Sequence, residues 1–161
     1  MKRRAFLGKA VATGLVAAVA PGVATGSDNK TAESSRSKLR VISTDRAPKP
    51  VGPFSQAIKA NGFVFVAGIT ARDPKTGQVI EDNITRQTEQ VMENIKAILE
   101  AAESSLDRTV KTTVYLKDMN DFDAMGKVYS RYFQNHLPAR VTVQVSQLHG
   151  GRIEIELLAL A

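Results

Sequence analysis

The chain has 161 residues, a net charge of +6 from 22 basic and 16 acidic residues, and no cysteine. Without cysteine it has no disulfide, no thiolate nucleophile and no cysteine-ligated metal site. Residues 1–40 hold eight of the basic residues and two of the acidic ones, so residues 41–161 carry 14 of each sign. Residues 41–161 therefore have no net charge, which gives no support for nucleic-acid binding, because such binding needs a basic surface.

The first 26 residues have the layout of an export signal. A basic start that includes Arg3 and Arg4 is followed by a run of Ala, Val, Gly and Thr without charge. A positive start, a short apolar run and a small-residue end are typical of secretory signals. The shortness of the run and Pro21 within it disfavour a transmembrane helix. Because the adjacent arginines resemble a twin-arginine signal, we expect a periplasmic or otherwise exported protein without a stable membrane anchor after cleavage.

Residues 27–40 are predicted to be a disordered spacer. They are rich in Ser, Lys, Thr and Asn and have no periodic apolar positions. Residues 41–161 then form a single small domain, because about 120 residues suffice for one hydrophobic core.

Strands are expected first in this domain, at 41–43, 56–60 and 63–68. The dipeptide Asn61-Gly62 separates the second and third runs and favours a hairpin. A helix capped by Asp82 or Asn83 follows. Its apolar positions form one stripe, made of Ile84, Val91, Ile95, Ile98, Leu99 and Ala102.

The second half continues with an alternating strand at 109–117 and a second helix opened by Asn120. The apolar residues of that helix recur at helical spacing, at Phe122, Met125, Tyr129, Tyr132 and Phe133. The order β-β-β-α-β-α-β-β predicts an α+β domain with two helices on one face of a mixed sheet.

The last two dozen residues, 138–161, contain two alternating segments around a Gly-containing turn, which is typical of paired strands. If their apolar rows share the helix-covered face, Arg140, Glu154 and Glu156 share the open face. That open face must meet water or another copy of the chain, and small domains with an uncovered sheet commonly associate symmetrically.

Several longer motifs occur together in residues 41–161, and together they are specific. They are Gly52–Gln56 (GPFSQ), Asn94–Ala102 (NIKAILEAA), Val110–Phe122 (VKTTVYLKDMNDF), Pro138–Arg140 (PAR) and Ile153–Glu156 (IEIE). In these motifs the domain resembles the reactive intermediate deaminase family, also called the RidA or YjgF family. The resemblance implies a chorismate-mutase-like fold, a homotrimer with sites in clefts between subunits, and no cofactor or metal.

The activity implied by the resemblance is hydrolysis of enamines and their imine tautomers, such as 2-aminoacrylate or other 2-imino acids, to 2-oxo acids and ammonia. Arg140 matches the family's arginine for the substrate carboxylate, which a guanidinium pairs through two parallel hydrogen bonds. Glu156 matches the acidic residue that positions or polarises the attacking water. An imine carbon is already electrophilic, so a positioned water and a proton acceptor suffice. The remaining substrate-binding positions implied are Phe54, Gly68, Asn120 and Thr142.

Some positions depart from the family pattern. Phe54 stands where many members have tyrosine, and Ala67 stands where many have serine. The turn Leu148–Gly151 is shorter than usual and lacks the Leu-Pro start. These departures keep the carboxylate clamp but make the cleft more apolar.

Simpler roles compete with the catalytic ones. Arg140 can be an exposed strand-end charge, Glu156 can pair with a neighbouring cation, and Asn120 can be a helix cap. His136 and His149 have no ligand partners at metal-binding spacing and are interpreted as surface residues. Two further function classes therefore stay open: a non-catalytic binder of small carboxylates or protein-protecting factor, and, less favoured, an RNA-cleaving relative.

Overall fold

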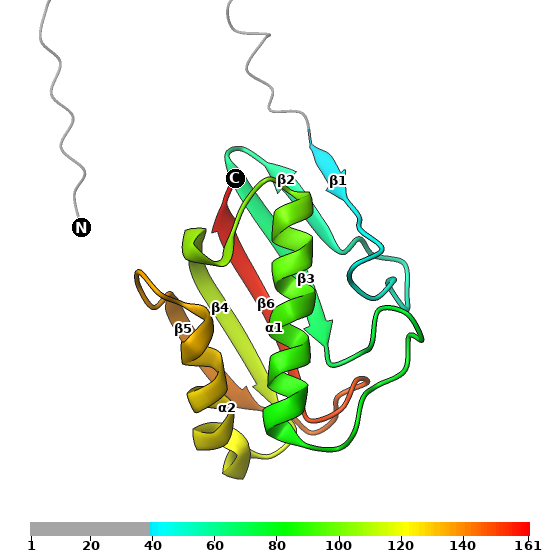
Figure 1. The fold of residues 1–161 in the computed structure, drawn as a ribbon, viewed down its shortest axis with the longest axis vertical. Coiled ribbons are helices and arrows are strands. Elements are labelled where there is room, and N and C mark those ends of the chain that lie inside the picture. Colours follow the sequence, from blue (N-terminus) through cyan, green and yellow to red (C-terminus); the bar gives the residue numbers. More distant parts are fainter. Residues whose placement is uncertain (1–38) are drawn as a thin grey trace, which may run out of the picture. The chain divides into compact units, whose positions relative to one another are not determined.

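The computed structural model describes residues 39–161, so the expected export signal and almost all of the spacer lie outside the described residues. The elements follow the predicted order (Figure 1). The strands are β1 (Arg40–Ile42), β2 (Ala57–Ala60), β3 (Phe63–Thr70), β4 (Thr109–Leu116), β5 (Ala139–Gln144) and β6 (Ile153–Leu160). The helices are α1 (Ile84–Ala101) and α2 (Phe122–Tyr129). The first strand thus begins at Arg40, the residue expected to end the spacer.

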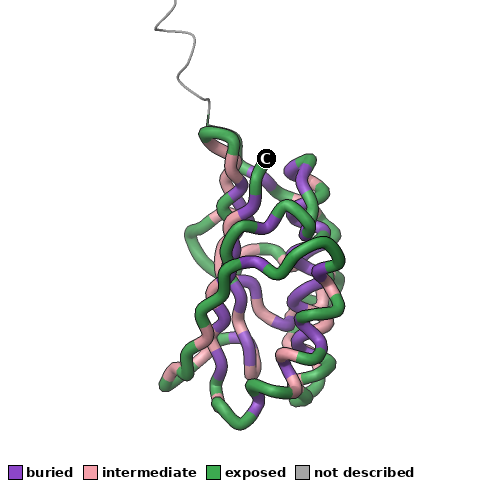
Figure 2. The backbone as a smooth tube through the Cα atoms, turned by 90° about the vertical axis from the view of Figure 1, so that its left-hand side faces the viewer, coloured by how far each residue is buried: buried purple, intermediate pink, exposed green. Residues whose placement is uncertain are grey.

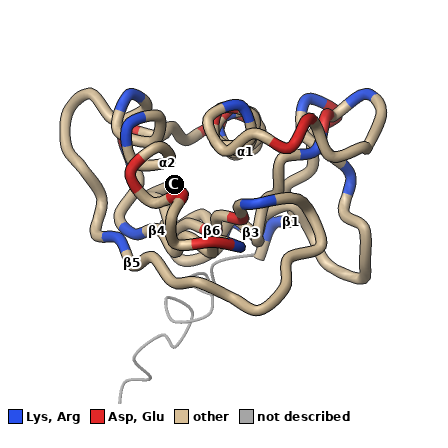
Figure 3. Tube along the Cα trace, turned by 90° about the horizontal axis from the view of Figure 1, so that it is seen from below, with Lys and Arg blue, Asp and Glu red and all other residues tan. Residues whose placement is uncertain are grey.

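The six strands form one mixed sheet in the order β1-β2-β3-β6-β4-β5. β4 and β5 run parallel, and all other neighbouring pairs are antiparallel. Both helices lie on the same side of the sheet (Figures 1 and 3). The predicted α+β architecture is confirmed. Among the described residues, none of the helices is long and apolar enough to span a membrane.

The core lies between α1 and the sheet, and Figure 2 shows the buried residues gathered between these two layers. The predicted stripe of α1 provides its helix side. Five of the six stripe residues are fully buried: Val91, Ile95, Ile98, Leu99 and Ala102. Met92, outside the predicted stripe, is fully buried as well. Full burial of an aliphatic side chain contributes about 1.5–3 kcal/mol. This stripe therefore holds α1 against the sheet and fixes the strands that carry the site.

The last two strands do not form the expected hairpin. β6 pairs with β3 and β4, while β5 pairs only with β4, so β4 separates them. The reason is the β4-α2-β5 unit, in which a helix returns the chain to a strand that lies parallel and adjacent to the first. Alternation predicted both strands correctly but does not identify a strand's partner.

The faces of β5 are also reversed relative to the expectation. The Arg140 guanidinium lies over the rings of Phe122 and Tyr129 of α2, at 5.4 and 5.0 Å from their centroids. Arg140 therefore faces the helix layer, whereas Val141 and Val143 are 44% and 39% exposed on the open face. Aromatic rings stabilise a guanidinium above them, so α2 accommodates the polar row of this edge strand.

The helix caps are partly as predicted. Asn83 caps α1, and its side chain accepts a hydrogen bond from the backbone N–H of Arg86. Asn120 does not cap α2. It lies within the turn Met119–Asp121, where its own N–H donates to the Asp118 carboxylate at 2.9 Å. Because a 3₁₀ turn precedes α2, the side chain that satisfies the first free N–H comes two residues earlier.

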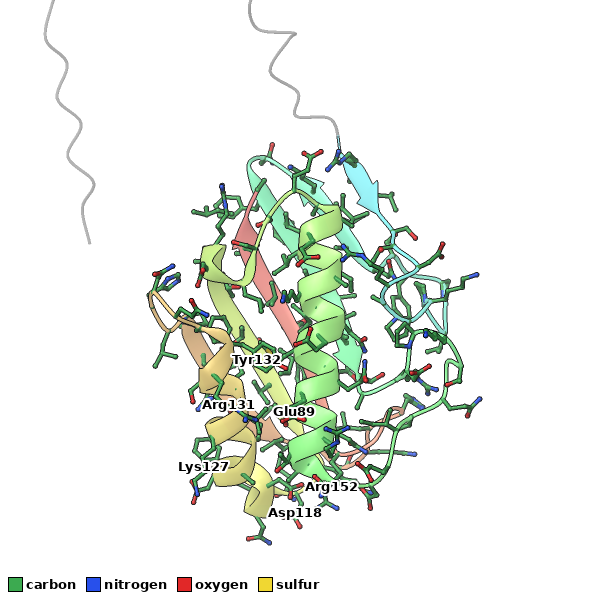
Figure 4. All side chains as sticks on the ribbon, viewed as in Figure 1. Glu89, Asp118, Lys127, Arg131, Tyr132 and Arg152 are labelled. Atoms are coloured by element: carbon green, nitrogen blue, oxygen red, sulfur yellow. The ribbon has the colours of Figure 1, made fainter. Side chains whose placement is uncertain are left out.

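Charged side chains on the helix side pair locally. Glu89 of α1 accepts hydrogen bonds from Arg86 and Arg131, and the second of these joins α1 to the turn after α2 (Figure 4). In Figure 3 the Lys and Arg residues are dispersed over helices and loops, with acidic residues among them. Basic and acidic residues are equal in number over residues 41–161, so this part of the chain has no net positive charge to attract a polyanion.

Candidate functional site

A pocket of about 210 Å³ lies where the β1–β2 loop meets the end of β3 and the start of β6. Its wall is largely apolar, with Pro48, Val51, Phe54 and Ile69 among the lining residues. The polar side chains that line it come from Lys49, Gln56, Thr70, Arg72, His149 and Glu154. An apolar pocket with a few convergent polar groups is the usual form of a small-molecule site.

The β1–β2 loop is held in place by the side chain of Gln56. Its amide nitrogen donates to the carbonyls of Thr44, Ala47 and Pro48, and its oxygen accepts the N–H of Thr44 at 2.7 Å. A buried amide with every bond satisfied fixes a loop that has no secondary structure of its own. Phe54, which is 49% exposed, is thereby placed at the pocket wall.

Glu154 enters the pocket because β3 bulges beside it. Between the pairs Val66–Leu157 and Ile69–Ile155, two residues of β3 lie opposite one residue of β6. Gly68 is in this bulge, and a Cβ there would lie only 2.0 Å from the Glu154 carboxylate oxygen. Bulges re-aim side chains, and here the missing side chain makes room for a carboxylate.

Burial raises the pKa of Glu154 above that of an ordinary glutamate, and the nearby Glu156 carboxylate raises this pKa further. A carboxylate with a raised pKa in an apolar pocket is suited to exchange protons with a substrate or a water.

Glu156 itself does not line this pocket. It is exposed on the open sheet face, where its carboxylate accepts a hydrogen bond from the Tyr115 hydroxyl at 3.3 Å. The structure thus places Glu154, not Glu156, beside Phe54 and Gly68. Both glutamates were expected on the open face, and only the bulge, which the sequence did not reveal, distinguishes them.

Arg140 and Thr142 lie on β5, the edge strand beside β4. The Arg140 guanidinium forms no hydrogen bond or ion pair with another described residue, so its five N–H donors remain available. The Thr142 hydroxyl is buried without a hydrogen-bond partner among the described residues. Asn120 is exposed beside α2, near Asp123. These three predicted site residues therefore share one edge of the molecule, away from Phe54 and Gly68.

The two groups cannot meet within one chain. β5 is two strand positions from β6, which carries Glu154, and three from β3, which carries Gly68, and these separations correspond to about 10 and 14 Å between backbones. Arg140 also faces the helix layer, whereas the Glu154 side chain lies on the open face with Tyr115, its cross-strand neighbour. A small substrate held by both groups requires a second copy of the chain.

Other clusters in the described residues are less suited to chemistry. No group of three or more His, Asp or Glu side chains there could hold a metal ion. Tyr132, at the end of the turn after α2, donates a hydrogen bond to the Glu89 carbonyl of α1, and burial together with the nearby Glu93 carboxylate raises its pKa to about 12. It therefore stays a neutral phenol at physiological pH.

Comparisons with known proteins show similarity to one protein family. Residues 44–161 match the family described as Endoribonuclease L-PSP. A RutC family protein of Pyrococcus horikoshii is 58% identical over 120 residues, which are 74% of this chain and 95% of that protein. The 2-iminobutanoate/2-iminopropanoate deaminase of Mus musculus is 41% identical over 122 residues, which are 75% of this chain and 90% of that protein.

Solved structures agree with this similarity. RidA from the Antarctic bacterium Psychrobacter sp. superposes with a TM-score of 0.73 at 41% identity, covering 76% of this chain and 99% of that chain. TdcF of E. coli, solved with bound serine, superposes with a TM-score of 0.72 at 35% identity, covering 76% of this chain and 98% of that chain.

Proposed function

The chain belongs to the Endoribonuclease L-PSP family, which includes proteins named 2-iminobutanoate/2-iminopropanoate deaminase, and on this premise we propose that it hydrolyses 2-imino acids to 2-oxo acids and ammonia. One observation carries the proposal. The free guanidinium of Arg140 and the pocket that contains Glu154 supply the two functions that such a substrate needs, a carboxylate clamp and a proton acceptor.

We propose that the active molecule is a homotrimer in which β5 of one subunit lies against the pocket of the next. The division of the site between the edge strand β5 and the pocket at the end of β3 supports this arrangement, since a closed ring of three brings two unlike surfaces of the chain together. The open face supports it too, because it exposes large apolar side chains. These are Phe65, Val141, Val143 and Leu160, each between 39% and 50% exposed. Such a patch is unfavourable in water and is typical of a subunit interface.

In the proposed site, Arg140 binds the substrate carboxylate and Glu154 takes a proton from the attacking water. The imine carbon needs no nucleophilic side chain, so a positioned water is sufficient. The serine bound in the related TdcF structure supports a small amino- or imino-acid ligand. Asn120 and Thr142 remain candidates for secondary contacts on the Arg140 side of the site.

A non-catalytic carboxylate binder is the competing function, because Phe54 and Ala67 supply no hydroxyl to the pocket. Two measurements on the wild-type protein separate the two. An enzyme releases ammonia from 2-iminobutanoate faster than spontaneous hydrolysis and also binds 2-oxobutanoate in calorimetry. A protein that binds 2-oxobutanoate but releases no additional ammonia is a binder, and the deaminase proposal then fails.

We also propose that the protein is exported through the twin-arginine route. Changing both Arg3 and Arg4 to Lys is expected to retain the folded protein in the cytoplasm, because that route reads the paired arginines. Cell fractionation of the wild type and the double variant measures this. Undiminished export of the variant would instead indicate a general secretory signal.

A further inference from the structure

The backbone around His149 is anchored beside the pocket. The His149 carbonyl accepts a hydrogen bond from Nη2 of Arg72 at 3.0 Å. The next residue, Gly150, is buried against β3, since a Cβ there would lie 2.3 Å from the Cβ of Thr70. Only glycine at this position leaves room for the Thr70 side chain.

The far side of the same turn is anchored to α1. Gly151 has a φ of +101°, and a Cβ there would lie 2.4 Å from Oε1 of Gln87. That same oxygen accepts the N–H of Arg152 at 2.7 Å, and the Arg152 guanidinium forms a two-pronged ion pair with Asp121. The turn that carries His149 is therefore fixed on both sides, although the His149 side chain is exposed.

The side chains that line the pocket offer few groups for proton transfer. The charged or titratable ones are Lys49, Arg72, His149 and Glu154. Arg72 is committed to the carbonyls of Gly77 and His149, and a guanidinium does not release its proton. Imidazole is the one side-chain type that ordinarily changes charge between about pH 5 and 8. Glu154 and His149 line the same pocket, where the charge of the imidazole lowers the pKa of Glu154 against the effect of burial.

We propose that His149 is a second catalytic residue of the deaminase, a proton donor to the imine nitrogen; this inference rests on the proposed function. Protonated His149 gives its proton to the nitrogen while water adds to the imine carbon and loses a proton to Glu154. The resulting carbinolamine collapses as the hydroxyl proton passes to His149 and the Glu154 proton passes to nitrogen. The C–N bond breaks, ammonia leaves, and both residues return to their starting states.

This role compensates for the apolar side chains nearby. A pocket with Phe54 in its wall has no phenol hydroxyl there to interact with the substrate nitrogen or a water. The short turn with two glycines brings an imidazole to the same pocket instead. The sequence suggested only a surface histidine, because His149 and Glu154 become neighbours through the fold and not through spacing.

The test measures kcat against pH for the wild type, His149→Gln and His136→Gln. The protein has only these two histidines. His136 is a matched control, because it bonds the Thr109 carbonyl beside the start of β4, away from the pocket. We expect His149→Gln to lower kcat roughly 100-fold, within the range of general acid catalysis, and to abolish the alkaline decline of kcat. His136→Gln should keep the wild-type profile.

Two further readouts exclude a merely structural effect. His149→Gln should bind 2-oxobutanoate as the wild type does, and added imidazole should restore part of the kcat of His149→Ala. If the wild type is active and His149→Gln keeps its pH profile, the role of His149 is overturned while the proposed function stands. A loss of kcat in His149→Ala that imidazole does not restore would lead to the same conclusion. A wild type with no deaminase activity would overturn the proposed function and this inference together.

Discussion

Replacing Arg140 with alanine is expected to lower kcat/KM on 2-iminobutanoate by roughly two orders of magnitude or more. A charge-assisted hydrogen bond in a partly water-excluded site contributes about 1.5–3 kcal/mol, and the guanidinium forms two to one carboxylate. Each 1.4 kcal/mol lost from transition-state binding lowers the rate tenfold. Steady-state kinetics at neutral pH measures the effect.

The stability of the fold should change little, because Arg140 is exposed and its interactions with the Phe122 and Tyr129 rings are weak at such sites. Arg140→Lys is the matched variant. It keeps the charge but loses the planar fork, so it should recover only part of the rate. Wild-type kinetics in Arg140→Ala would show that the carboxylate is bound elsewhere.

Replacing Glu154 with glutamine should lower kcat by about two to four orders of magnitude, the usual contribution of a general base. The amide fills the same space against Gly68 but accepts no proton, so KM should change less than kcat. Because the Glu154 pKa is raised, the acid-side decline of wild-type activity should lie above the pH at which an ordinary glutamate is protonated.

Two variants distinguish the two glutamates of β6. Gly68→Ala retains Glu154 but forces its carboxylate aside, so it should lose much of the same activity. Glu156→Gln removes the neighbouring negative charge, so it should keep kcat near the wild-type value and move the acid-side decline to lower pH. A large loss of kcat in Glu156→Gln with none in Glu154→Gln would restore the role that the sequence resemblance gave to Glu156.

The architecture could be predicted because its determinants are local. The stripe on α1, the Asn61-Gly62 turn and the alternation in β4 each require only neighbouring residues, and all were correct. The predicted pairing of β5 with β6 was wrong, because the packing of the β4-α2-β5 unit places β5 beside β4. The face of Arg140 was wrong for a related reason, since the two rings of α2 favour a guanidinium where alternation alone placed valines.

The site was harder to predict than the fold. Phe54 and Gly68 were named from motifs and do share a pocket. The place of Glu154 in the pocket could not be predicted, because an alternating pattern does not reveal the bulge at Gly68. His149 is exposed, as its lack of partners at metal-ligand spacing predicted, but its position beside the pocket depends on the fold. In the proposed trimer, Arg140 reaches this pocket from a second chain, and the sequence pattern of one chain does not specify contacts between chains.

Mixed oligomers of two inactive variants test the shared site most directly. If Arg140 of one subunit serves the Glu154 pocket of the next, Arg140→Ala and Glu154→Gln are each inactive alone. When equal amounts are co-assembled at random, about a quarter of the sites combine an intact arginine with an intact pocket. We expect trimers isolated from the mixture to recover about a quarter of the wild-type activity. Mixed trimers with no more activity than either variant alone would contradict it, because each site would then lie within a single chain.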